Sequence, residues 1–384
     1  MPEEYKKLPM YRYLMILTIA SMGGLQVWRT LFNNFAVEMA HLNGDQVGVI
    51  QAVREIPGFL ALLAIFVIRL IPEHRLSALS IFTLGLGVAV TGFFPSYTGL
   101  IATTLLMSFG FHYYETTNQS LTLQYFTQDE APRVFGRLRS VAAAANIGVG
   151  LVIFLLTILL TYQNIYLMMG TAVIGLAVWG LFQKPADKFK PPQRKKMILR
   201  KKYWLFYFLT FMAGARRQIF VAFAVFLLVK RFAFSVQEVT ALFVVNNIIN
   251  YFLSPLIGKA IVRFGERRVL SLEYGSLIFV FLGYAFAASK ITVAFLYILD
   301  HIFFNFAIAI RTYFQKIGDP RDIAPSMAVG FTINHIAAVV MPAVGGLLWM
   351  IDFRIPFFIG AVFSLVSLAA VQYIKRSLKT AQTS

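Results

Sequence analysis

Charged and amide side chains fall near the centres of several apolar segments, where they could bind a polar solute or carry a proton. In the first half, Arg29 and Asn33 stand four residues apart, and His112 and Glu115 stand three apart. Residues at these spacings share one face of a helix, so each pair can point into one cavity. A charge inside a membrane is costly, which makes each of these residues a candidate for function.

The second half carries a comparable set. Arg217 lies near the middle of its apolar segment, and Asp300 opens a polar stripe. An arginine holds a carboxylate, phosphate or sulfate through paired hydrogen bonds, whereas acids and histidines can gain and lose a proton. The predicted substrate-binding residues are Arg29, Asn33, Arg217, Asn247, Asn250 and Asn334. The predicted proton-coupling residues are Glu115, Asp300, His112 and His335.

Alternatives remain for each group. We expect Glu115 and Asp300 to face Arg29 and Arg217, either as a working pair or as a structural ion pair. The asparagines could instead form hydrogen bonds between helices. Arg216 could face another helix, and Arg54–Glu55, nearer the outer end of its segment, could be a gate or a packing pair.

Composition requires a membrane environment for these side chains. Of 384 residues, 58% are hydrophobic and 14% charged, and the mean hydropathy is +0.70. Apolar runs long enough to cross a bilayer recur along the chain, and backbone hydrogen bonding in lipid makes them helices. The sequence therefore predicts an all-α integral membrane protein with twelve spans, at about 11–40, 46–71, 76–94, 98–126, 133–160, 163–182, 203–231, 236–263, 268–287, 291–316, 322–350 and 354–376.

Lysine and arginine set the predicted orientation. If both termini are cytoplasmic, 26 of the 35 basic residues fall on that side, nine of them between residues 183 and 202. This asymmetry is typical of a multi-pass protein of a bacterial-style cytoplasmic, or inner, membrane whose basic loops meet lipid headgroups. The net charge of +18 therefore does not indicate a nucleic-acid partner.

Two sequence stretches recur in the two halves. Arg29–Val37 resembles Arg217–Val225, and Ala131-Pro132 is echoed by Ala324-Pro325. Internal repeats of this kind are common in transporters. We expect a six-helix bundle at 1–182, a basic cytoplasmic linker at 183–202 and a second, pseudo-symmetric six-helix bundle at 203–384.

The architecture resembles the major facilitator superfamily, and one local motif supports it. The family's loop pattern Gly-x-x-x-Asp-Arg-x-Gly-Arg-Lys/Arg is partly matched at Gly258–Arg268, where Val262 replaces the aspartate. The first copy, around residues 69–75, is degraded. The resemblance implies transport by rocking of the two halves, with gating by Arg263, Arg267 and Arg268 in the second half.

The sequence has no phosphate-binding loop of the P-loop type, no metal-ligand cluster and no hydrolase elbow, so we expect neither an enzyme nor a bound metal or cofactor. We predict a monomeric secondary transporter of a small organic anion or amphiphile, coupled to protons. The alternatives are a drug-efflux antiporter and, in another class, a transport-inactive sensor or assembly partner.

Overall fold

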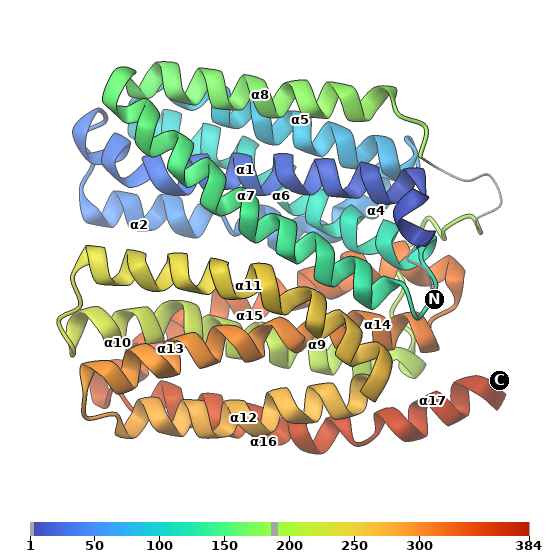
Figure 1. Cartoon of the computed structure of the whole chain (residues 1–384). Helices are drawn as coiled ribbons and strands as arrows, with labels where there is room; N and C mark the ends of the chain where they lie inside the picture. The colour runs from blue at the N-terminus through green and yellow to red at the C-terminus, as the bar shows by residue number, and fades with distance from the viewer. Residues whose placement is uncertain (1–3, 186–190, 384) are drawn as a thin grey trace. The chain divides into compact units, whose positions relative to one another are not determined.

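A computed structural model describes residues 4–185 and 191–383. Residues 186–190 of the predicted linker, with Lys188 and Lys190, lie outside the described residues, as do residues 1–3 and 384 of the predicted bundles. The described residues form helices and no strand, which confirms the all-α fold class. The main helices are α1 (Pro9–Glu38), α2 (Gly44–Val53), α3 (Ile56–Phe59), α4 (Ala64–Val67), α5 (Glu73–Thr91), α6 (Tyr97–Tyr125), α7 (Ala131–Leu159), α8 (Tyr162–Phe182), α9 (Trp204–Gln218), α10 (Val225–Lys230), α11 (Val236–Phe264), α12 (Glu266–Phe286), α13 (Lys290–Phe304), α14 (Ile308–Ile317), α15 (Ile323–Ile351), α16 (Ile355–Val371) and α17 (Ile374–Thr383) (Figure 1).

Within the described residues, eleven helical segments are long and apolar enough to cross a membrane. Helix α6 has 29 residues, and its polar side chains lower its hydropathy, so it is the twelfth helix of membrane length. The chain is a multi-pass membrane protein. Short polar caps begin several helices; the side chains of Ser96, Thr161 and Ser289 each accept a hydrogen bond from a backbone N–H in the first turn.

The chain divides into two compact units. The first comprises Met1–Phe126, Val141–Met197 and Arg321–Val329. The second comprises Thr127–Ser140, Ile198–Pro320 and Gly330–Ser384. The bundle limits predicted from the sequence, 1–182 and 203–384, remain a prediction.

In the first unit, α5 packs closely against both α6 and α8. A Cβ added at Gly110 of α6 would lie 2.3 Å from the backbone nitrogen of Leu84, and one at Gly87 would lie 2.5 Å from that of Met107. Gly170 of α8 meets the backbone of Ala89 in the same way. Glycine is therefore what allows these backbones to touch.

In the second unit, α12 lies beside α16 (Figure 1). Their contact is aromatic: the rings of Tyr284 and Phe357 stack with centroids 5.1 Å apart. The first residues of α7 also belong to this unit, where Gly136 approaches the backbone of Ser254 and Ser140 Oγ donates to the carbonyl of Tyr251 at 2.6 Å.

Three spans are irregular within about a turn or two of charged residues. The second span breaks after Val53, and 3-10 turns occupy Leu60–Leu63. The seventh passes into a π-helix at Ile219–Ala224, and the tenth into a 3-10 turn at Asn305–Ala307. Such interruptions are frequent at functional sites because they free backbone groups and redirect side chains.

Replacing Gly110 by alanine should destabilise the protein, because the new methyl group meets α5 backbone that cannot move aside. Overpacking of this kind costs about 1–3 kcal/mol and outweighs the gain in helix propensity. The midpoint of thermal unfolding in detergent should fall by several degrees. Gly148→Ala is the matched control, since nothing lies within 4 Å of a Cβ there. Equal midpoints for the two variants would contradict this account of the packing.

Candidate functional site

A buried arginine lies at the centre of the second unit. Arg216 of α9 is 2% exposed. Its Nη2 lies 3.7 Å from Oε1 of Glu273 in α12, and its Nη1 donates to Oγ of Ser367 in α16. The guanidinium also lies over the ring of Tyr274, 4.3 Å from its centroid. Side chains of α12 and α16 therefore hold the cation of α9.

A second buried carboxylate shares that cation. Asp300 of α13 is 2% exposed and interacts electrostatically with both Arg216 and Glu273. One oxygen of each acid, Oδ2 of Asp300 and Oε2 of Glu273, has no hydrogen-bond partner among the described residues. The fully buried groups are thus two acids and one arginine. Half-buried Arg139 adds a further electrostatic contact to Glu273.

An amide network continues from this cluster along α13. Asn305 Nδ2 donates to Oδ1 of Asn250 at 2.5 Å, so the Nδ2 of Asn250 faces Nε2 of His301 at 2.7 Å. An amide nitrogen can only donate, so this Nε2 accepts and His301 is neutral, with its proton on Nδ1. Of the predicted substrate residues, Asn250 is therefore engaged in holding α11 against α13.

The predicted arginine of the second unit has a different position. Arg217 is exposed, and its guanidinium lies 5.8 Å from the centroid of the Phe304 ring. The expected pairing of Asp300 with Arg217 is wrong by one residue, because consecutive helical positions point about 100° apart and only Arg216 faces the core. Asn247 is half-buried and donates to the carbonyl of Phe243 at 2.9 Å.

Two further predicted residues of this unit lie on α15. Asn334 Nδ2 donates to the carbonyl of Thr210 at 3.2 Å. A Cβ added at Gly214 would lie 2.4 Å from the backbone oxygen of Asn334. His335 is buried; its Nδ1 lies 2.9 Å from the carbonyl oxygen of Phe331, and its ring stacks on that of Phe331. The Asn334 contact fixes α15 against α9, whereas the His335 contacts lie within α15.

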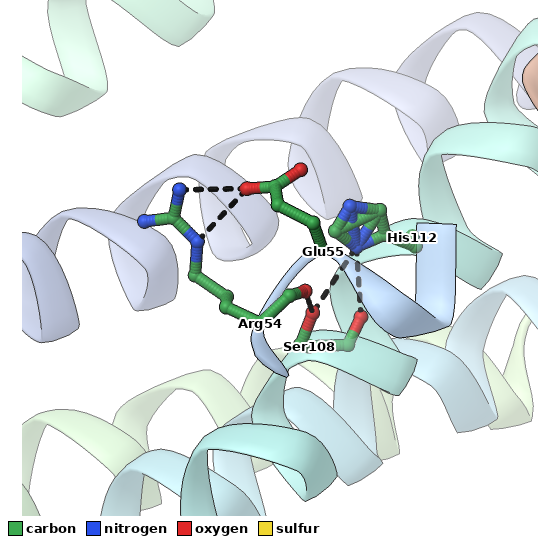
Figure 2. A network of polar contacts seen from close by, with 4 residues as sticks. All are labelled: Arg54, Glu55, Ser108 and His112. Carbon is green, nitrogen blue, oxygen red and sulfur yellow. Dashed lines mark hydrogen bonds and ion pairs between the residues drawn. The ribbon is translucent and has the colours of Figure 1, made fainter. Parts of the chain in front are cut away.

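The first unit has a polar network at the break in the second span (Figure 2). Pro57 has no N–H to continue the helix, and the carbonyl of Arg54 accepts a hydrogen bond from Ser108 Oγ at 2.5 Å. Ser108 Oγ also lies 3.2 Å from Nδ1 of His112, and Arg54 pairs with Glu55 at 2.7 Å. This pair is about a quarter exposed, with side-chain exposures of 22% and 27%.

The remaining predicted residues of the first unit are more accessible. Arg29 and Asn33 are exposed, and Glu115 is half-buried. Of the residues predicted in this unit for substrate binding or proton coupling, the network in Figure 2 includes His112, together with the Arg54–Glu55 pair.

The predicted gating arginines lie where α11 meets α12. Arg263 and Arg268 are exposed, and Arg267 donates to Oε1 of Gln372 at 3.1 Å. Between them, Glu266 is buried and pairs with Lys316 of α14 at 2.8 Å. The gating role of the three arginines remains a prediction.

Glu273 is not among the residues that the sequence predicts for the site. A usable signal was present. In α12 the buried apolar residues Val269, Leu270 and Leu277 repeat at helical spacing, and Glu273 stands on the same stripe. An acid on an apolar stripe requires a buried partner.

Removing the buried cation should be far more damaging than removing its exposed neighbour. Arg216→Ala leaves Glu273 and Asp300 without their guanidinium and should cost about 3 kcal/mol or more of stability. Arg217→Ala should change stability by less than about 0.5 kcal/mol, since Arg217 is exposed. Thermal unfolding of the two variants in detergent measures the difference, and matching midpoints would count against the buried cluster.

Comparison with solved structures identifies the fold. The chain is similar to the human organic anion transporter MFSD10, with a TM-score of 0.78, 10% identity and coverage of 97% of this chain and 100% of the other. It is also similar to a bacterial homologue of the iron transporter ferroportin, with a TM-score of 0.78, 12% identity and coverage of 96% and 99%. A third match is the E. coli fucose:proton symporter, with a TM-score of 0.75, 13% identity and coverage of 95% and 98%.

No curated protein sequence matches the chain. A sequence model of a transporter family does, over residues 14–317, which is most of the chain. The family is that to which the repeat, the partial loop motif and the twelve membrane-length helices pointed. Members of this family are non-enzymatic membrane proteins that transport a solute. The chain belongs to the Major Facilitator Superfamily.

Proposed function

We propose that this protein is a proton-coupled secondary transporter of a small organic anion. The observation that carries the proposal is the sharing of one buried guanidinium, that of Arg216, by two buried carboxylates. Two carboxylates and one arginine leave an excess negative charge in a medium of low polarity, where charge is costly. Binding a proton removes that excess.

Asp300 is the better proton carrier of the two acids. Glu273 lies 3.7 Å from Arg216 and keeps a standing counter-ion. Asp300 precedes the 3-10 turn at Asn305–Ala307, where the helix can bend. A change of bend that moves Asp300 relative to Arg216 would alter its proton affinity, which is the requirement for coupling.

The anionic substrate is supported by the exposed arginines. Arg217 and Arg29 each lie on the accessible surface of their own unit, and a guanidinium recognises carboxylate, phosphate or sulfate through paired hydrogen bonds. The similar structure of a human organic anion transporter agrees with this class, and that of a fucose:proton symporter agrees with proton coupling.

Drug efflux is the second candidate, because Asp300 has aromatic neighbours. It interacts electrostatically with the side chains of Tyr284 and Tyr297. In that case the arginines would not contact the solute. We further propose that the protein acts as a monomer in the cytoplasmic membrane with both termini cytoplasmic, its basic loops on lipid headgroups.

Asp300→Asn should abolish accumulation driven by a pH gradient but retain counterflow exchange, because the shape of the site survives and the titrating group does not. A thermal-shift screen of the purified protein against a metabolite library first supplies the substrate. Uptake into proteoliposomes, with and without an imposed gradient, is then measured. Asp352→Asn, an exposed acid beside α16, is the control. Gradient-driven accumulation by the Asp300 variant would transfer the role to Glu115, His112 or His335.

Arg217→Ala should weaken binding of the anion by about 2 kcal/mol, since a charged hydrogen-bond donor is lost. Arg217→Lys should recover little, because an ammonium group cannot make paired hydrogen bonds. The dissociation constant is measured on purified protein. Arg231→Ala is the control, as Arg231 is also exposed and also lies against an aromatic ring, that of Phe353. Unchanged affinity in Arg217→Ala would favour the drug-efflux alternative.

A further inference from the structure

The linker makes specific contacts with the start of α15 and with the 3-10 turn at Pro320–Asp322 that precedes it. Gln193 Oε1 accepts a hydrogen bond from the backbone nitrogen of Ala324 at 2.9 Å. The backbone nitrogen of Arg194 donates to the carbonyl of Arg321 at 2.8 Å, and the Arg194 guanidinium pairs with Asp322. The first N–H groups of a helix have no partner within it, so the Gln193 side chain acts as a cap supplied from elsewhere in the chain.

The buried end of this contact is Asp322. Its side chain is 0% exposed, whereas that of Arg194 is 28% exposed. Breaking an ion pair with a buried carboxylate is more costly than breaking a surface ion pair.

The same linker residues are tied to the end of the second span. Arg69 Nε donates to the carbonyl of Lys195 at 2.6 Å, and Lys195 Nζ donates to the carbonyl of Arg69 at 3.2 Å. We call residues 193–195 the strap. All of its contacts described above lie within the first compact unit, which includes Arg321–Val329.

We propose that the strap is a gate of the transport cycle, with Arg194 and Gln193 as its gating residues. Helix α15 starts in the first unit and continues in the second from Gly330 onward. Movement of one unit against the other must therefore pull residues 321–329 away from the strap or bend the helix. The strap holds this helix end until its contacts break.

Arg69, the basic residue that begins the degraded loop around residues 69–75, contacts the linker. The proposed gate requires only that the transporter alternates between conformations. It does not depend on which substrate or coupling ion is carried.

The chain contains no cysteine, so Ser326→Cys introduces a single thiol. Ser326 is 0% exposed in the helix end that the strap holds. The rate of its alkylation by a maleimide is measured in purified full-length protein in nanodiscs, where both faces are accessible. With the strap intact the thiol should react slowly. Arg194→Ala and Asp322→Asn should each raise the rate about tenfold, because each breaks the buried pair.

Lys196→Ala is the matched control: it removes one positive charge from the exposed residue that follows the strap and should leave the rate unchanged. Arg194→Lys should recover part of the protection. If Arg194→Ala does not remain monodisperse, Gln193→Ala tests the cap alone and should raise the rate about threefold. Equal rates for the parent, Arg194→Ala and Gln193→Ala would overturn the strap. No substrate or pH gradient is used, so failure of the proposed anion transport would leave this result unaffected.

Discussion

Burial of charge is the constraint that organises the second unit. A charged group loses several kcal/mol of solvation when it leaves water, and only close partners compensate for that loss. Arg216 is therefore surrounded by Glu273, Tyr274 and Ser367, from two other helices. These contacts fix how α9, α12 and α16 face one another. The apolar packing between them, including the stacked rings of α12 and α16, follows from that arrangement.

The first unit handles charge differently. Arg54 and Glu55 are adjacent in sequence and remain about a quarter exposed, so their pairing costs less desolvation. Their effect on structure is through the backbone. The break after Val53 frees the carbonyl of Arg54, and the hydroxyl of Ser108 satisfies it.

The membrane fold could be predicted because it depends on properties that sum along the chain. Runs of about 20 apolar residues and a skewed distribution of basic residues need no knowledge of contacts. The site depends on which face of each helix turns inward. Neighbouring Arg216 and Arg217 are chemically identical, so only packing decides which one is buried. The sequence also does not reveal which glycines allow close helix contact. A Cβ added at Gly110 would meet the backbone of α5, whereas nothing lies within 4 Å of a Cβ added at Gly148. The strap joins residues more than 120 positions apart, for which the sequence pattern carries no signal.

The π-helix at Ile219–Ala224 gives the arginine pair a further property. A π-helical turn holds one residue more than the α-helical turn it replaces, and that extra residue can be displaced along a helix without unfolding it. If it moved to the N-terminal side of the pair, every residue between the two positions would shift back by one place along the helix. Arg217 would then occupy the place of Arg216 beside the carboxylates, and Arg216 would move to the preceding place. Two successive arginines next to a π-turn make such a register shift neutral in charge, so the acids would keep a guanidinium throughout.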